Sequence, residues 1–166
     1  MSTITKRVDL GMLVPKAGTV VELGVAKGRF SSSLLSRWPQ IGRLYAVDKW
    51  NDDRHARSEV GEALANLQDG RVSILIMTFE EAAALVSGTQ FDLVYVDGYA
   101  HTGQDDGQTL DLWWPLVKRG GVFAGHDYDR AWPLTVKSVD RFCAKNGLVT
   151  NVIREKPYGS WWVQKA

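Results

Sequence analysis

Four carboxylates end or follow short apolar runs, where a buried strand reaches the edge of a sheet: Glu22, Asp48, Asp97 and Asp127. Asp97 and Asp127 follow runs that we expect to be neighbouring parallel strands, so their side chains can converge at one edge. Carboxylate oxygens suit Mg²⁺, or Mn²⁺ if a histidine takes part, and such an ion would lower the pKa of a bound hydroxyl group. In the alternative interpretation, Asp97 supports a ligand pocket and Asp127 caps the following loop.

Two histidines, His101 and His126, fall in the loops that follow the same two runs. The ordinary pKa of an imidazole suits proton transfer near neutrality, so each histidine is a candidate general base. The alternative is a hydrogen-bonded histidine with a structural role. His55 lies in a polar segment and is expected at the surface.

The stretch 20–31 predicts a strand, a tight turn and the start of a helix. Gly24 permits the turn, Gly28 permits the first helix turn to approach a ligand or the sheet closely, and a helix N-terminus attracts a carboxylate or a phosphate. The G-x-G-x-x-G spacing of a dinucleotide-binding fold is absent because Ala26 holds the middle position, which argues against a nicotinamide oxidoreductase. Asp48 lies about twenty residues further on, an offset at which an acid accepts hydrogen bonds from ribose hydroxyls.

The elements that would position these residues alternate between strands and helices. We predict strands at about 19–23, 44–48, 72–76, 91–98 and 122–125, and a final pair at 148–154 and 160–163. We predict helices at about 30–37, capped by Ser31, Ser32 or Ser33, and at 54–67, 80–86, 109–117 and 136–145, with a turn at 119–121. This alternation predicts a mostly parallel sheet with helices on both faces.

The chain has 166 residues, which fits one domain over residues 1–166 with residues 1–18 as a short lead-in. The net charge is +1 and no long basic run occurs, so we expect no nucleic-acid partner. The single cysteine, Cys143, fits a reducing compartment, and no signal peptide or run of membrane-spanning length is visible. We therefore expect a cytoplasmic protein with no membrane partner.

Seven tryptophans are a high number for this length. Most are expected in the core, but Trp50, Trp113, Trp114 and Trp132 stand beside motif positions and could wall a pocket for an aromatic or apolar substrate. The pair Trp161-Trp162 could mark the face of a homodimer, although a strand packed on a helix explains it as well.

Four blocks of this sequence occur in the order found in class I S-adenosylmethionine-dependent methyltransferases, which the chain resembles: Glu22-Leu23-Gly24 with Gly28, residues 47–50, residues 91–98 and residues 114–122. The blocks that begin at Asp97 and at Gly125 resemble a bacterial group of small, often metal-dependent, macrocin-type O-methyltransferases. The resemblance implies a Rossmann-like sheet of seven strands whose last strand is antiparallel. It also implies S-adenosylmethionine bound across the carboxyl ends of the first and fourth strands.

The resemblance also assigns residues to the cofactor. Glu22, Gly24 and Val25 would line the methionine end, and Gly28 would also contact the cofactor. Lys27, Arg29 or Ser31 would take the carboxylate, alone or with helix N–H groups. Asp48 would hold the ribose with Lys49 and Trp50 nearby, Thr78, Phe79 and Glu80 would flank the adenine, and Asp97 and Gly98 would lie beneath the sulfonium.

The chain departs from this family pattern at three places. Ala26 replaces a common glycine, which is tolerable if its φ is negative, and the loop at residues 99–104 lacks the usual Asp-His-x-Tyr pattern. Little chain precedes the first strand, so we expect either an open active site or one covered by a second subunit.

We therefore predict an S-adenosylmethionine-dependent methyltransferase that methylates a hydroxyl group of a small molecule. Activation would come from a divalent metal at Asp97 and Asp127, or from His101 or His126 as a base. The alternatives are an N-methyltransferase, which needs no metal, and a non-catalytic module that binds S-adenosylmethionine. Methylation of nucleic acid is disfavoured because the chain has no Asn-Pro-Pro-Tyr block and no basic stripe.

Overall fold

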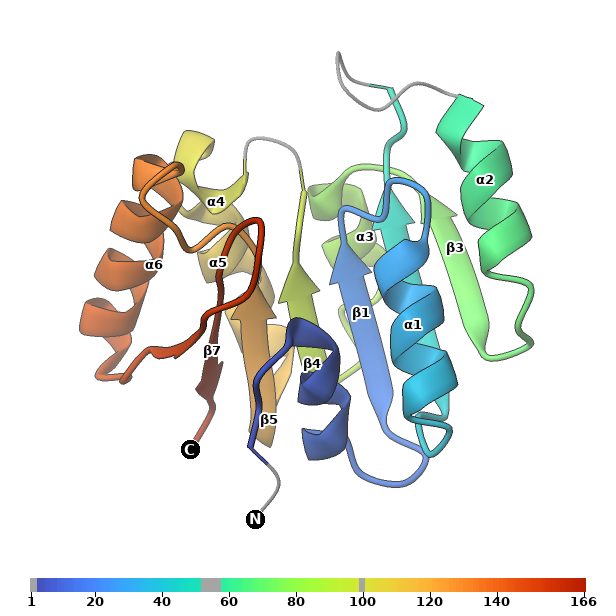
Figure 1. Ribbon diagram of the computed structural model, residues 1–166, viewed down its shortest axis with the longest axis horizontal. Helices are drawn as coiled ribbons and strands as arrows, with labels where there is room; N and C mark the ends of the chain where they lie inside the picture. Colours follow the sequence, from blue (N-terminus) through green and yellow to red (C-terminus); the bar gives the residue numbers. More distant parts are fainter. Residues whose placement is uncertain (1–2, 52–57, 99–100) are drawn as a thin grey trace.

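A computed structural model of the protein describes residues 3–51, 58–98 and 101–166, without the side chains of residues 101 and 102. Its elements are η1 (Arg7–Leu13), β1 (Thr19–Leu23), α1 (Arg29–Arg37), β2 (Arg43–Asp48), α2 (Ser58–Asn66), β3 (Val72–Ile76), α3 (Phe79–Leu85), β4 (Phe91–Val96), α4 (His101–Gln104), α5 (Gln108–Trp113), η2 (Trp114–Leu116), β5 (Val117–Gly125), α6 (Pro133–Asn146), β6 (Asn151–Ile153) and β7 (Ser160–Gln164). Strands and helices alternate as far as α6, as the sequence predicts (Figure 1).

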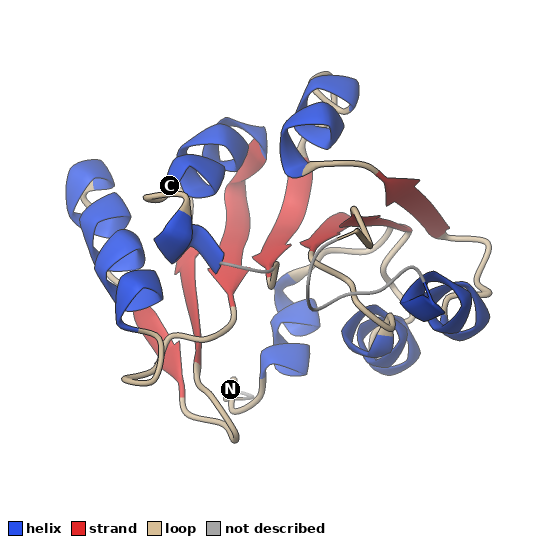
Figure 2. Cartoon of the chain, turned by 90° about the horizontal axis from the view of Figure 1, so that it is seen from above, coloured by secondary structure: helices blue, strands red, loops and turns tan. Residues whose placement is uncertain are grey.

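The seven strands form one sheet in the order β3-β2-β1-β4-β5-β7-β6 (Figure 1). β1 to β5 are parallel, and β7 pairs antiparallel with both β5 and β6. The predicted seven-stranded, mostly parallel sheet with an antiparallel last strand is therefore confirmed. Helices lie on both sides of this sheet when it is seen from above (Figure 2).

Alternate residues of β1 supply two separate cores, because successive side chains of a strand point to opposite faces. Val21 and Leu23 pack in one cluster with residues of α3, α5 and α6. Val20 packs in the other cluster with residues of η1, α1 and α2. β4, in the middle of the sheet, is buried over its whole length, which is typical of a parallel strand covered on both faces.

β5 is longer than the sequence predicts. Residues 119–121, predicted as a turn, lie inside the strand. Val117 of β5 pairs with Phe91 of β4, and Val122 pairs with Leu93, only two residues further along β4. The intervening residues of β5 therefore form a bulge. Gly120 has φ of 77° there, which glycine adopts without strain. Gly120 and Gly121 therefore interrupt the hydrogen bonding between β5 and β4 without ending the strand.

Two further predictions need correction. α1 begins at Arg29, and its N-cap is Gly28 with φ of 74° and no side-chain hydrogen bond, so none of the three serines caps it. A left-handed backbone is required at that position, and glycine supplies it more easily than serine. The helix predicted at 109–117 ends at Trp113, and a short 3-10 helix then leads into β5.

The tryptophan pair near the C-terminus has a packing role. Trp161 is buried in the same cluster as α6, and Trp162 is half-buried on the opposite face of β7. The packing of β7 against the rest of the fold therefore accounts for the positions of both tryptophans. No helix in the described part of the chain combines the length and the apolar composition needed to cross a bilayer.

η1 is fastened to α1 and the loop after it. Trp38 Nε1 donates a hydrogen bond to Val8 O at 2.6 Å, and Arg37 forms an ion pair with Asp9 at 3.0 Å. Gly11 lies so close to the Trp38 ring that a Cβ at this position would collide with it. The lead-in is therefore a packed element. It brings Arg7 to Asp97, directly after the carboxyl end of β4.

Candidate functional site

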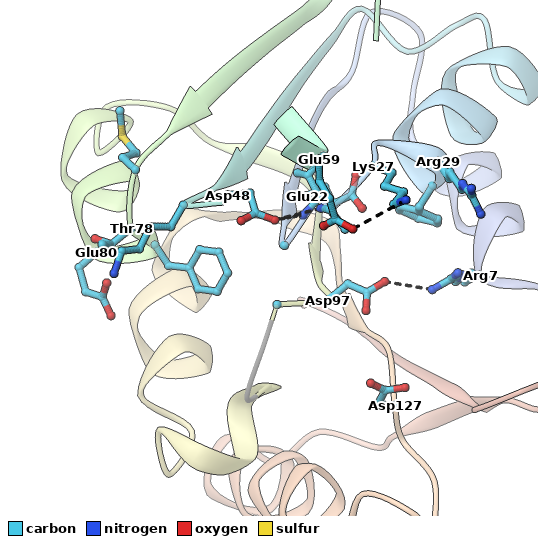
Figure 3. A pocket seen from close by; sticks show the side chains of 18 of the residues that line it. Arg7, Glu22, Lys27, Arg29, Asp48, Glu59, Thr78, Glu80, Asp97 and Asp127 are labelled. Carbon is cyan, nitrogen blue, oxygen red and sulfur yellow. Dashed lines mark hydrogen bonds and ion pairs between the residues drawn. The ribbon is translucent and has the colours of Figure 1, made fainter. Parts of the chain in front are cut away.

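A pocket of about 620 Å³ opens at the carboxyl ends of β1, β2 and β4 (Figure 3). β1 pairs with β2 on one side and with β4 on the other, so the strand order reverses here. Open α/β sheets bind their ligands at such a reversal point. Most residues that the sequence assigns to the cofactor line this pocket: Glu22, Gly24, Val25, Lys27, Asp48, Lys49, Thr78, Phe79, Asp97 and Gly98.

The turn after β1 forms the floor of the pocket. Gly24 has φ of 92°, and a Cβ there would collide with the Gly98 backbone. Ala26 has φ of 47°, so the negative φ that would make an alanine tolerable at this position is not observed. Hydrogen bonds hold Ala26 in this conformation: its N–H donates to Asp48 at 2.9 Å, and its carbonyl accepts from Trp50 Nε1 at 2.7 Å.

Asp48 ties the end of β2 to this turn. Its Oδ2 accepts from the Val25 N–H at 2.8 Å and from the Ala26 N–H, and its Oδ1 accepts from the Trp50 N–H at 2.8 Å. The carboxylate is buried yet lines the pocket. Its binding of ribose stays a prediction, and its bracing of the turn is an additional role that sequence spacing did not reveal.

Glu22 and Ser31 form a buried pair beneath the pocket. Ser31 is fully buried, does not line the pocket, and donates its hydroxyl hydrogen to Glu22. Burial raises the pKa of Glu22 well above its ordinary value, although the Ser31 hydrogen bond opposes this rise. The structure therefore places the Ser31 hydroxyl against Glu22 and not toward a ligand.

Three of the predicted cationic and aromatic residues lie as follows. Lys27 Nζ is 2.8 Å from Glu62 Oε1 and 3.9 Å from Glu59 Oε1, which links the turn to α2. Lys49 is exposed at the rim of the pocket. Trp50 is buried behind the pocket, with φ of 45°, and supports the turn.

The opposite wall of the pocket is built at the start of α3. Thr78 caps this helix in a reciprocal arrangement with Glu81, which fixes the entry into α3. The Phe79 ring packs so closely on Gly98 that a Cβ at Gly98 would meet its edge. This wall is where the resemblance assigns the adenine.

Asp97, His126 and Asp127 converge at the end of β4 and β5, with one ligand atom from each within 4.8 Å of the others. His126 Nδ1 lies 2.9 Å from Asp127 Oδ1 and 3.5 Å from Asp97 Oδ1. Burial lowers the pKa of His126, but its hydrogen bonds to Asp127 and Asp97 outweigh burial and raise the pKa to about 9. At neutral pH His126 is therefore a cation between two carboxylates.

Asp127 has φ of 58°, a conformation that costs a non-glycine residue about 1–3 kcal/mol and concentrates at functional sites. Trp132 lines the pocket beyond it, and its ring contacts Tyr158 edge-on at 5.7 Å. Tyr128 donates its hydroxyl hydrogen to Asp140 at 2.6 Å and does not line the pocket. Of the two aromatic residues that follow β5, only Trp132 therefore borders the pocket.

Arg7 is a site residue that sequence reasoning missed. Its Nη1 donates to Asp97 Oδ2 at 3.0 Å, its Nε lies 4.0 Å from Glu155 Oε1, and its guanidinium stands 5.5 Å from the centre of the Phe30 ring. It lines the pocket from η1, a segment that the sequence marks only as a lead-in. Nothing local singles out this arginine, because its position depends on how η1 packs on α1.

Other predicted residues lie elsewhere. His101 begins α4, but its side chain is outside the described part of the chain, as is the whole of His55. Asp105 accepts hydrogen bonds from the backbone N–H groups of Gly107 and Thr109 at the start of α5. Cys143 is buried.

Comparison with known proteins identifies the family of this fold. The sequence model of a family described as a methyltransferase domain matches residues 21–128. No curated protein sequence matches the chain significantly.

Solved structures resemble nearly the whole chain. The O-methyltransferase from Bacillus cereus in complex with SAH has a TM-score of 0.68 and 18% identity, over 99% of this chain and 83% of that one. Cofactor-bound Rv0187 from MTB has a TM-score of 0.75 and 18% identity, over 99% and 81%. An rRNA methylase from Streptococcus thermophilus has a TM-score of 0.71 and 12% identity, over 99% of both chains. These TM-scores establish a shared fold, and the structures that share it include one described as an O-methyltransferase and one described as an rRNA methylase.

Proposed function

This chain belongs to the family of S-adenosylmethionine-dependent methyltransferases, and we propose that it methylates a hydroxyl group of a small molecule. The observation that carries this proposal is the convergence of Asp97, His126 and Asp127 beside the pocket. A hydroxyl group is a poor nucleophile until it loses its proton, so an O-methyltransferase needs charged groups of this kind where the acceptor binds.

The pocket supports the orientation required for methyl transfer, which is an in-line displacement at the sulfonium carbon. With adenine at Phe79 and ribose at Asp48, the sulfonium would lie above Gly24 and Gly98, and the acceptor would enter beside Asp127. Gly24 and Gly98 permit the close packing of the turn, the end of β4 and Phe79 on which this placement depends, because a Cβ at Gly24 would collide with the Gly98 backbone and a Cβ at Gly98 with the Phe79 ring. Trp132 would exclude water from the acceptor side.

The donor set of Asp97, His126 and Asp127 fits a divalent cation. Two carboxylates suit Mg²⁺, and the imidazole favours a transition metal such as Mn²⁺. When bound, the cation would increase the acidity of an acceptor hydroxyl. The protein groups set conditions on this binding, because Asp97 already pairs with Arg7 and because His126 must release its proton to become a ligand.

Without a cation, the three side chains form a network of opposite charges. The raised pKa of His126 keeps its proton in place at neutral pH, so the imidazolium orients Asp97 and Asp127 and does not itself accept the acceptor proton. Asp127, which is buried and lines the pocket, is then the carboxylate that would receive that proton.

The test measures release of S-adenosylhomocysteine from S-adenosylmethionine with a panel of phenols and sugars and with matched amines. Each reaction is run with EDTA, with Mg²⁺ and with Mn²⁺. Asp127→Asn is expected to reduce turnover of a hydroxyl acceptor by about 100-fold or more. Asp129→Asn is the matched control, because Asp129 lies two residues away and its side chain accepts a hydrogen bond only from the Ala131 N–H among the interactions described.

Three outcomes separate the alternatives. Turnover of hydroxyl acceptors that Asp127→Asn abolishes and Asp129→Asn spares supports the proposal. Turnover of amines alone, insensitive to EDTA, would establish an N-methyltransferase. Binding of S-adenosylhomocysteine without turnover of any acceptor in the panel would favour a non-catalytic binding module.

A further inference from the structure

We infer that Arg7 binds the carboxylate at the amino acid end of the methyl donor, with Asp97 beside it facing the ammonium group. This inference rests on the proposed function, since it concerns the cofactor of that reaction. S-Adenosylmethionine carries an ammonium and a carboxylate on one carbon atom. A complementary site therefore needs an acid and a base at adjacent positions, and Arg7 Nη1 and Asp97 Oδ2 lie 3.0 Å apart at the pocket.

This pair lies on the side of the pocket opposite to the residues assigned to the adenine. Figure 3 shows Thr78 and Glu80 on one side of the pocket, Asp48 nearer the middle, and Arg7 on the opposite side with Asp97 pointing toward it. Adenine at the Thr78 side directs the amino acid end toward Arg7. The pocket thus offers a polar pair of opposite charges at the end where the cofactor has one.

The other candidates for the carboxylate are less suitable. Lys27 pairs with Glu62 of α2 at 2.8 Å, whereas the acid that pairs with Arg7 is Asp97, which is assigned here to the ammonium group. The Ser31 hydroxyl is turned away toward Glu22. Arg29 lines the pocket and forms no ion pair among the described residues, but it is exposed, so water screens its charge. The Arg7 side chain is only 32% exposed, so an anion held by it gains more from the interaction.

Arg7 is held in place before any ligand binds. Its backbone N–H donates to Glu155 Oε1 at 3.2 Å, and the same oxygen accepts from the Ser160 hydroxyl at 2.9 Å. The guanidinium also rests on the Phe30 ring, which stacks on Tyr95 at 4.2 Å. Because these contacts fix the side chain in advance, little conformational entropy is lost when it binds a carboxylate.

The contribution of the amino acid end can be isolated with two ligands. S-Adenosylhomocysteine carries the amino acid, whereas 5′-methylthioadenosine has the same adenosine and sulfur but lacks the amino and carboxyl groups. Calorimetry with both ligands is carried out on the wild type, Arg7→Met, Arg7→Lys and Arg37→Met. Arg37→Met is the control for loosening of η1, because Arg37 anchors η1 through Asp9 and does not line the pocket.

We expect Arg7→Met to weaken the binding of S-adenosylhomocysteine by about 10- to 100-fold, which is the loss of affinity typical of removing one hydrogen-bonded ion pair. The affinity for 5′-methylthioadenosine should change by less than about twofold, because this ligand does not reach Arg7. Arg7→Lys, which keeps the charge but loses the planar fork, should give a smaller loss confined to S-adenosylhomocysteine. Arg37→Met should leave both affinities close to those of the wild type.

Several results would overturn the inference. Equal losses for the two ligands in Arg7→Met would mean that Arg7 acts only on the fold, and unchanged affinity for S-adenosylhomocysteine would mean that it does not touch the carboxylate. If circular dichroism shows that Arg7→Met is unfolded, Arg7→Lys decides by the same comparison. A wild type that binds neither ligand would instead contradict the proposed function, so the two failures are distinguishable.

Discussion

The charge of His126 predicts a specific loss of stability at alkaline pH. The side chain is 11% exposed, and its hydrogen bonds to Asp127 and Asp97 raise its pKa to about 9 in the folded protein, against 6.5 in the unfolded chain. A group with a raised folded pKa contributes stability below the unfolded pKa and loses it as the pH rises through the folded pKa. At about 1.4 kcal/mol per pKa unit, this difference corresponds to a contribution of about 3 kcal/mol.

The assay is urea unfolding followed by circular dichroism in the presence of EDTA, at intervals from pH 6 to pH 10. We expect the free energy of unfolding of the wild type to fall by up to about 3 kcal/mol between pH 6.5 and pH 9.5. His126→Gln removes the titrating group, so its stability should be lower at pH 6.5 and should change much less over this range. Parallel curves for the two proteins would refute the reasoning, because the slope would then come from other groups.

Three further predictions concern the floor of the pocket and the core. Gly24→Ala should abolish calorimetric binding of S-adenosylhomocysteine because its Cβ would meet the β4 end at φ of 92°, whereas Gly70→Ala, with open space around it, should bind normally. Asp48→Asn should lower the free energy of unfolding by about 1–3 kcal/mol, since one amide oxygen cannot accept all three backbone N–H bonds that the two carboxylate oxygens accept. The same substitution should also weaken the binding of S-adenosylhomocysteine. Phe123→Ala should cost about 3–5 kcal/mol in urea unfolding, because this buried ring contacts several other aromatic rings, whereas Leu85→Ala, at an exposed position, should cost less than about 0.5 kcal/mol.

Local pattern was sufficient for most of the fold. The strands at 19–23 and 72–76 have the predicted limits because each is an apolar run bounded by turn residues. The turn predicted at 119–121 was wrong because glycines also permit a bulge, and the pairing with β4, which no local pattern records, decides between the two. The positive φ at Ala26 was not predictable for a related reason, since it is held by hydrogen bonds to residues far away in the sequence: the Ala26 N–H donates to Asp48, and its carbonyl accepts from Trp50.

The site was predictable where strand ends supply it. Asp97 and Asp127 meet because parallel strands end at one edge of the sheet, and this follows from topology. The contact partners of the polar side chains near the turn after β1 were not predictable in the same way. Ser31 faces Glu22, and Lys27 faces α2, because helix rotation and tertiary packing decide which partner each side chain meets.

The position of β7 has a consequence for the order in which the protein can assemble during synthesis. β6 is translated first, but it lies at the sheet edge beyond β7 and is hydrogen-bonded to that strand. It therefore has no place on the sheet until Ser160 and the residues after it have left the ribosome. Glu155, which holds Arg7, lies between these strands and is itself held by Ser160. A nascent chain stalled before β7 would carry the pocket floor of β1, β2 and β4 while its arginine anchor was still incomplete.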